Sequence, residues 1–157
     1  MMDLTSQYKS RVVTPQEAVK AIKSGQRVFL SGNVSVPQKV LAALVDYAPN
    51  LTDVEIAQVL TIGPADYVDP AMEGHLRVNT MFISANVRKA VQEGRVDFTP
   101  VMLSEFPLLF KRGLMSLDVA LIHVSPPDEH GFCSLGVEAG PTKTPAEMAK
   151  IVIAEVN

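Results

Sequence analysis

The apolar run from residue 119 to 124 is the feature that most limits what this chain can fold into. Apart from His123, its residues are apolar at successive positions rather than at alternate ones. That pattern indicates a strand buried on both faces, as in sheets covered by helices on either side. Pro126 and Pro127 follow almost at once. Because proline fixes φ and lacks an amide hydrogen, the chain must leave the sheet there.

Short apolar strands alternate with amphipathic helices along the rest of the chain. Thr14, Pro15 and Glu17 match a helix start in which threonine and glutamate form a capping box, and Gly25 is expected to end that helix. The other predicted helices follow residues 31–37, begin at Ser84–Ala85–Asn86 and at Ser104, and include a short helix that follows a loop from residue 139 and is capped by Thr144. The predicted strands are 27–30, 53–60, 78–83, 98–103, 118–124 and 151–156.

Strands that alternate with helices predict βα units and a mainly parallel sheet. Right-handed crossovers then place helices on both faces, so the predicted fold class is a doubly wound α/β domain. The 157 residues are enough for one domain with a proper core and too few for two ordinary ones. We therefore expect residues 1–157 to form a single α/β domain.

Composition argues against several classes of partner. The net charge of −3 gives no reason to expect nucleic acid or an anionic membrane as partner, and no apolar run approaches membrane-spanning length. Residues 1–11 lack the apolar core of a signal peptide, and the single cysteine, Cys133, suits a reducing compartment. We expect a cytoplasmic protein, with Cys133 packed in a loop rather than acting as a nucleophile.

Four predicted strand-to-helix turns carry small or polar residues where open α/β sheets bind ligands. Backbone N–H groups and helix dipoles at such turns favour a carboxylate, a phosphate or a thioester oxygen. Each residue taken alone is also explained as a helix cap or a turn former. The predicted substrate-binding residues are Gly32, Asn33, Thr61, Gly63, Ser84, Asn86 and Ser104.

No metal site is expected, because Asp128, Glu129 and His130 are too close together in sequence and no second His or Cys pair supports them. If this chain contained a nucleophilic carboxylate, Glu129 and Glu105 would be the candidates. Both are also explained as solvated or helix-capping carboxylates. His123, in an apolar strand, is expected to be a core histidine. No catalytic residue is assigned.

Three blocks of the chain resemble the acetyl-CoA hydrolase/transferase family, which includes 4-hydroxybutyrate CoA-transferases. The loop Ser125–Pro126–Pro127–Asp128, with Gly131 and then Ser134–Leu135–Gly136, is similar to one found in that family. The turn at residues 32–37 is similar to its first strand-to-helix turn. Residues 82–88, 98–100 and 103–110 are similar to its middle section, and the resemblance extends only to its amino-terminal half.

The resemblance implies a ping-pong transfer of coenzyme A between an acyl-CoA and a small carboxylate, with no permanently bound cofactor. Family members are much longer, with two similar α/β domains in one polypeptide, and the nucleophilic glutamate belongs to the second. We therefore expect that glutamate to lie outside this chain, with a second α/β domain supplied in cis or in trans and a homo-oligomer formed. The chain alone is expected to be inactive and to expose apolar surface on its last strand and on the turns.

Two alternatives remain open at this stage. Water in place of the acceptor carboxylate would give an acyl-CoA hydrolase of the same family. A ligand-binding or interaction module without catalysis is the other. Against a dinucleotide role, no G-x-G-x-x-G follows any strand, and against a P-loop there is no Gly-Lys-Ser/Thr.

Overall fold

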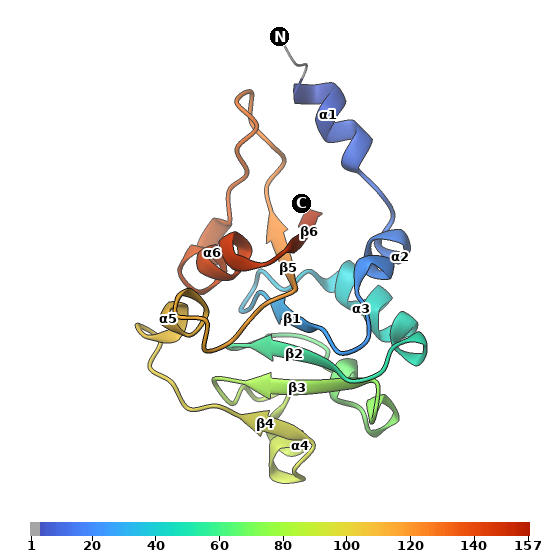
Figure 1. Ribbon diagram of the computed structural model, residues 1–157, viewed down its shortest axis with the longest axis vertical. Coiled ribbons are helices and arrows are strands. Elements are labelled where there is room, and N and C mark those ends of the chain that lie inside the picture. The colour runs from blue at the N-terminus through green and yellow to red at the C-terminus, as the bar shows by residue number, and fades with distance from the viewer. Residues whose placement is uncertain (1–3) are drawn as a thin grey trace.

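The six strands of the computed structural model form one sheet in which every neighbouring pair is parallel (Figure 1). The structure describes residues 4–157. The order across the sheet is β4-β3-β2-β1-β5-β6, so the predicted doubly wound α/β class is confirmed. The strands are β1 (Arg27–Leu30), β2 (Val54–Gln58), β3 (Leu76–Thr80), β4 (Val96–Phe98), β5 (Val119–Val124) and β6 (Ile151–Val156).

Helices cover both faces of this sheet. One core contains residues of η1, α3 and α4, whereas the other contains residues of α5 and has α6 packed against it. No helix among residues 4–157 is long and apolar enough to cross a membrane. The α-helices are α1 (Leu4–Arg11), α2 (Pro15–Ala18), α3 (Gln38–Tyr47), α4 (Arg88–Gln92), α5 (Phe106–Lys111) and α6 (Ala139–Met148). The 3-10 helices are η1 (Val19–Ala21), η2 (Ala48–Asn50), η3 (Asp66–Val68), η4 (Pro70–Met72) and η5 (Gly136–Glu138).

The two cores explain why the central strands are apolar at successive positions. Side chains of a strand point alternately to its two faces. In β1, Val28 and Leu30 enter the core beneath α3, while Phe29 enters the other and meets the rings of Phe106 and Phe110. The same alternation occurs along β5. The run at 119–124 is thus a strand buried on both faces, as predicted.

The chain reverses its direction of growth across the sheet between β1 and β5. From β1 it builds outward through β2, β3 and β4, and then returns to add β5 and β6 on the other side of β1. Ligands of open α/β sheets bind outside the carboxyl ends of the strands, at such a switch point. We call the edge where the strands end the carboxyl edge, and the edge where they begin the amino edge.

The capping box at the first predicted helix is confirmed. The Thr14 hydroxyl accepts from the Glu17 amide at 3.2 Å, and the Glu17 carboxylate accepts from the Thr14 amide at 3.0 Å. The helix ends at Ala21, however, earlier than Gly25, because Ile22 turns to an extended backbone with ψ of 135°.

Helix α6 corrects the prediction of a loop from residue 139 followed by a short helix capped by Thr144. The helix begins at Ala139, and Thr144 and Pro145 lie buried inside it. Proline within a helix removes one amide donor, so the sequence pattern indicated a break where the fold has none. Pro145 is nevertheless accommodated: its own carbonyl accepts from the Ala149 amide at 2.9 Å.

Two predicted strands are shifted in the structure. β3 ends at Thr80 rather than at 83, and β4 occupies 96–98 instead of 98–103. Phe98 is the last β4 residue and Pro100 follows in irregular structure, as expected of a residue that cannot donate to a sheet.

Charged side chains hold the amino edge together. The Asp118 carboxylate, just before β5, accepts from the Arg27 amide at 3.0 Å and from Lys150 Nζ, just before β6, at 2.7 Å. Arg27 also pairs with Glu55 of β2, with an Nε–Oε1 distance of 2.9 Å. The hydrogen bond from Lys150, followed by that from the Arg27 amide, holds the pKa of Asp118 below its ordinary value of 3.8.

We expect this link to weaken in acid. A carboxyl group whose pKa is lowered on folding adds stability above its unfolded pKa, and that stability is lost as the pH falls through the folded value. Asp118→Asn should lower the free energy of unfolding at pH 7 by up to about 1 kcal/mol, because Lys150 is largely exposed. Urea unfolding at pH 7 and pH 3 measures this difference, which should shrink at pH 3.

The control is Asp46→Asn, on α3, whose exposed carboxylate forms no ion pair within the described part of the chain. It should change the free energy of unfolding little at either pH. An Asp118→Asn effect that is equal at both pH values would contradict the account.

Candidate functional site

The predicted substrate residues occupy turns at the carboxyl edge, but they do not form one site. Thr61, Gly63, Ser84 and Asn86 line a common pocket between the turns that follow β2 and β3, which we call the β2–β3 pocket. Gly32 and Asn33 lie beside it, in the turn after β1. Ser104 is exposed, forms no side-chain hydrogen bond among residues 4–157, and lines none of the three pockets described below.

Gly32 sits where no other residue fits. A Cβ atom at this position would lie 2.1 Å from the carbonyl oxygen of Leu60, a backbone atom that cannot rotate away as the end of a side chain can. The next residue, Asn33, donates its amide to the same oxygen at 2.8 Å and pairs with Thr61 in a parallel bridge. The turn after β1 is therefore locked against the turn after β2.

Asn33 is held in an unusual backbone conformation by a buried carboxylate. Its φ of +49° lies in the left-handed region, which asparagine adopts more readily than most residues. Its side-chain Nδ2 donates to Glu138 Oε2 at 2.6 Å. Glu138 is 4% exposed and lies at the end of η5, far along the sequence. Through this bond the segment after β5 fixes the turn after β1.

The β2–β3 pocket has a volume of ≈ 340 Å³, within the range of small-molecule sites. Its walls are mainly apolar, and the half-exposed Ile62 and Phe82 stand at its rim. Polar atoms of Thr61, Ser84 and Asn86 lie along one side. An apolar space with a few fixed polar groups suits a short acyl chain.

A chain of hydrogen bonds connects those polar groups in a single direction. Tyr67 donates its hydroxyl proton to Gln58 Oε1 at 2.9 Å. Burial raises the pKa of the Tyr67 hydroxyl above its ordinary value of 10.0, and this effect exceeds that of its hydrogen bonds to Thr61 and Gln58, which lower the pKa. The 2.8 Å contact between Thr61 Oγ1 and the Tyr67 oxygen must then carry the threonine proton. Thr61 Oγ1 in turn accepts from Asn86 Nδ2 at 3.2 Å.

The remaining donors of Asn86 and Ser84 are also in use. Asn86 Nδ2 donates its second hydrogen to the Gly63 carbonyl at 3.2 Å, and Ser84 Oγ donates to Asn86 Oδ1 at 2.6 Å. The hydroxyl and amide donors on this side of the pocket are thus committed within the protein. What these side chains still offer a ligand is acceptor capacity and a rigid surface.

Two predicted caps are wrong in detail. Ser84 does not cap α4: the residue before that helix is Val87, which makes no side-chain capping bond. Ser104 likewise does not cap α5, which Glu105 precedes without a capping bond. Serine has a short side chain that bonds within a turn as easily as to a helix end, and Ser84 does so with Asn86.

The amino terminus of α3 is already occupied by a carboxylate of the protein. Glu155, on the edge strand β6, accepts from the amides of Lys39 and Val40 at 2.9 and 3.1 Å. These are amides that the first turn of a helix leaves free. The expectation that this terminus favours a ligand anion is therefore wrong, since Glu155 supplies the negative charge itself.

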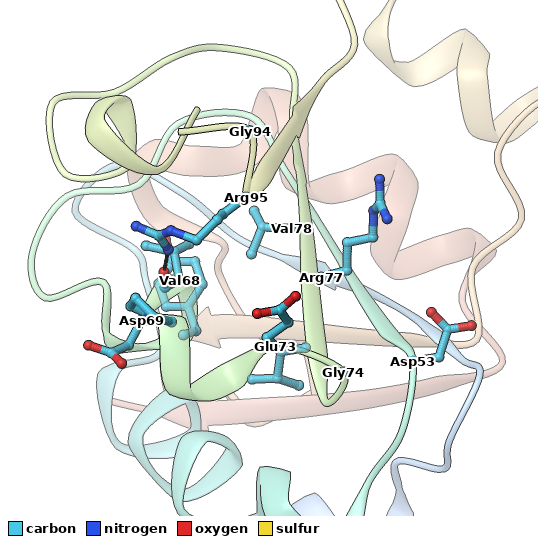
Figure 2. A pocket seen from close by; sticks show the side chains of 12 residues that line it. Asp53, Val68, Asp69, Glu73, Gly74, Arg77, Val78, Gly94 and Arg95 are labelled. Atoms are coloured by element: carbon cyan, nitrogen blue, oxygen red, sulfur yellow. Dashed lines mark hydrogen bonds between the residues drawn. The ribbon is translucent and has the colours of Figure 1, made fainter. Parts of the chain in front are cut away.

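Two further pockets lie elsewhere. The pocket between the ends of β1 and β5 has a volume of ≈ 260 Å³ and includes His123, Val137 and Asn157. The third, of ≈ 240 Å³, lies at the amino edge of β3 and β4. Figure 2 shows Arg95 of this amino-edge pocket extending to Val68, whose carbonyl accepts its hydrogen bond.

The amino-edge pocket has its cations already neutralised. Arg95 pairs with Glu93, and Arg77 pairs with Asp97. It also lies away from the edge at which parallel sheets bind ligands. We therefore base the functional argument on the β2–β3 pocket.

The other candidates from the sequence lie apart from the β2–β3 pocket. Glu129 is exposed in the loop after β5, and its Oε1 is 3.5 Å from His130 Nε2. Glu105 is also exposed. Cys133 is exposed, so its predicted packing in the loop is wrong, and its neighbour Phe132 is 74% exposed. No group of three metal-ligating side chains occurs in the described part of the chain.

Four residues of the carboxyl edge were not found by sequence reasoning: Gln58, Tyr67, Glu138 and Glu155. Gln58 is the one polar residue near the end of an apolar strand, which is a weak signal for a buried network. Tyr67, Glu138 and Glu155 gave no signal, because their partners are brought to them by the fold.

Exposed apolar side chains occur where expected, on β6 and on the carboxyl-edge turns, and also elsewhere, as at Val12, Leu114 and Val137. On β6, Ile151, Val152 and Val156 are 38%, 44% and 37% exposed. At the carboxyl-edge turns, the large exposed apolar residues are Val34, Ile62, Phe82, Met102 and Leu103.

Comparison with known proteins shows that the chain is similar to CoA-transferases. The family model described as the acetyl-CoA hydrolase/transferase N-terminal domain matches residues 1–157. The chain is 44% identical over 138 residues to a succinyl-CoA:acetate/propanoyl-CoA:succinate CoA transferase of Fasciola hepatica, covering 87% of this chain and 28% of that protein. It is 42% identical over 150 residues to a 4-hydroxybutyrate coenzyme A transferase of Clostridium kluyveri, covering 96% and 35%.

Among solved structures, the fold is similar to a 4-hydroxybutyrate CoA-transferase from Porphyromonas gingivalis, with a TM-score of 0.80 and 30% identity. The match covers 98% of this chain and 35% of that one. The chain thus spans about a third of the length of the relatives it matches.

The turn after β1 provides a test of the packing at this edge. Gly32→Ala should lower the free energy of unfolding by about 1–3 kcal/mol, because the added methyl group collides with the Leu60 carbonyl. Urea unfolding followed by circular dichroism measures the change.

Gly140→Ala is the matched control. Nothing lies within 4 Å of a Cβ at Gly140, which is in α6, so this variant should be as stable as the parent or slightly more so. Equal stability of the two variants would show that the turn is not locked as described.

Proposed function

Because the chain belongs to the acetyl-CoA hydrolase/transferase family, we propose that it forms one wall of the substrate cleft of a CoA-transferase. The enzyme moves coenzyme A between an acyl-CoA and a small carboxylate of the acetate or 4-hydroxybutyrate type. The observation that carries the proposal is the β2–β3 pocket, an apolar space at the carboxyl edge with polar groups fixed on one side.

The reaction runs through a glutamate supplied by a second α/β domain. Its carboxylate attacks the thioester carbonyl and coenzyme A leaves as the thiolate, which gives an acyl-glutamyl anhydride. The thiolate then attacks the glutamyl carbonyl, and the acyl group departs as a free carboxylate. The resulting glutamyl-CoA thioester reacts with the acceptor carboxylate by the same steps in reverse, so the energy of the thioester bond is retained.

In this scheme, residues of the present chain bind and orient the acyl group rather than attack it. Ile62 and Phe82 contact its apolar part, and Thr61, Ser84 and Asn86 form a rigid polar surface beside it. Rigidity matters because a fixed thioester reacts faster than a mobile one. Gly32 and Asn33 contribute by locking the adjacent turn, and coenzyme A takes part as a substrate, not as a resident cofactor.

The second domain is proposed to cover the apolar side chains that this chain exposes. The side chains concerned are those on β6 and on the turns of the carboxyl edge, and β6 presents an unpaired strand edge in the sheet. Exposed patches of this kind mark interaction surfaces. Covering the carboxyl edge would also exclude water from the β2–β3 pocket, which favours transfer over hydrolysis.

Hydrolysis is the second candidate, because the matching family description names hydrolases beside transferases. The two activities differ only in whether water or a carboxylate attacks the acyl or glutamyl carbonyl and displaces its leaving group. A product assay that separates free coenzyme A from newly formed acyl-CoA distinguishes them.

An exchange assay tests the proposal. Butyryl-CoA and labelled acetate are incubated with the 157-residue chain alone, and with the same chain joined to a second α/β domain of the family. We expect labelled acetyl-CoA from the joined form and none from the chain alone.

The control is the joined form with the glutamate of the second domain changed to glutamine, which should be inactive. Exchange by the chain alone would overturn the assignment of the nucleophile and direct mutation to Glu129 and Glu105. Release of free coenzyme A without acetyl-CoA would favour the hydrolase, and no reaction in any form would favour a binding module.

A further inference from the structure

Arg88 is the one ionisable residue that lines the β2–β3 pocket. It is the first residue of α4 and is exposed to solvent. The other lining residues belong to the two turns and are uncharged. No carboxylate lines the pocket, so Arg88 carries the one formal charge among its lining residues.

The guanidinium of Arg88 is not neutralised within the protein. It forms no ion pair and no side-chain hydrogen bond with any residue from 4 to 157. The basic residues around it differ in this respect, since Lys89 and Arg95 both pair with Glu93. Arg77 and Arg95 of the amino-edge pocket are likewise paired.

Arg88 also supplies what the other side chains of the pocket lack. The hydroxyl and amide protons of Thr61, Ser84 and Asn86 are all donated within the protein. A guanidinium carries five N–H donors, arranged to bind a carboxylate or a phosphate through two hydrogen bonds. Recognition of an anion by side chains in this pocket therefore falls to Arg88.

We propose that Arg88 binds an anionic group of the thioester substrate at the mouth of the β2–β3 pocket. The inference rests on the proposed function and extends it by identifying the residue that selects for charge. The anion is either a carboxylate at the far end of a dicarboxylic acyl chain or a phosphate of the coenzyme A moiety. Both present anionic oxygen atoms that a guanidinium binds through two hydrogen bonds, and the choice of thioesters below distinguishes them.

The test is calorimetric binding of three thioesters to the 157-residue chain: succinyl-CoA, butyryl-CoA and succinyl-pantetheine, which lacks the phosphates. Arg88→Gln removes the positive charge. Arg88→Lys keeps the charge but lacks the planar set of N–H donors that binds two oxygen atoms at once. Arg112→Gln is the matched control, because Arg112 is also exposed, lies just after α5 and lines none of the three pockets. Thermal unfolding checks that each variant is folded.

We expect Arg88→Gln to weaken binding about tenfold or more, as for the loss of a hydrogen bond to a charged group, and Arg112→Gln to leave it unchanged. Arg88→Lys should recover only part of the loss. Weakening of both succinyl thioesters but not of butyryl-CoA identifies the acyl carboxylate as the partner. Weakening of both coenzyme A thioesters but not of succinyl-pantetheine identifies a phosphate.

Equal binding of every thioester by Arg88→Gln and Arg112→Gln would overturn the inference while leaving the proposed function intact. If the parent chain binds no thioester, the proposed function fails at this site. Glutarate and pyrophosphate, titrated by NMR, then test Arg88 independently. If the parent chain binds either anion and Arg88→Gln abolishes that binding, the inference is sustained. If the parent chain binds neither anion, or Arg88→Gln binds them equally well, the inference is overturned.

Discussion

The contact between Gly32 and the Leu60 carbonyl is the constraint on which the carboxyl edge depends. It brings the turn after β1 against the turn after β2 with no space for a side chain. Asn33 then takes a left-handed conformation and reaches Glu138, and Thr61 is placed beside Tyr67 and Asn86. One close backbone approach thus fixes both the junction with the segment after β5 and the polar side of the β2–β3 pocket.

The two edges of the sheet are stabilised in different ways. At the amino edge, the ion pairs Arg27–Glu55 and Lys150–Asp118 are joined by a hydrogen bond from the Arg27 backbone amide to the Asp118 carboxylate. At the β2–β3 pocket, the links are neutral hydrogen bonds whose donors are all used. A neutral, saturated network adds no charge of its own, so Arg88 is the one charged residue among those that line this pocket.

Much of the fold could be predicted from the sequence because its signals are local. The run at 119–124 predicted a strand with two buried faces, and Thr14, Pro15 and Glu17 predicted a capping box that the structure contains. Local signals failed where contacts between distant parts of the chain determine the conformation. Pro145 lies inside a helix, and Ser84 bonds within its turn instead of capping α4.

The candidate site could be located from the sequence but not described. Turn residues indicated the carboxyl edge, and Thr61, Gly63, Ser84 and Asn86 do meet in one pocket. Glu138 and Glu155 act on residues more than a hundred positions away, a relation that no local pattern reveals. Tyr67, which orders the protons of the network, comes from an irregular segment that carried no periodicity.

The central claim is that the β2–β3 pocket receives the acyl group, and amide chemical-shift mapping tests it most directly. Butyryl-CoA is titrated into the ¹⁵N-labelled chain. The account predicts the largest shifts at Ile62, Gly63, Ser84 and Asn86, which line the pocket. Shifts confined to Asp69, Glu73 and Gly94 of the amino-edge pocket would contradict it.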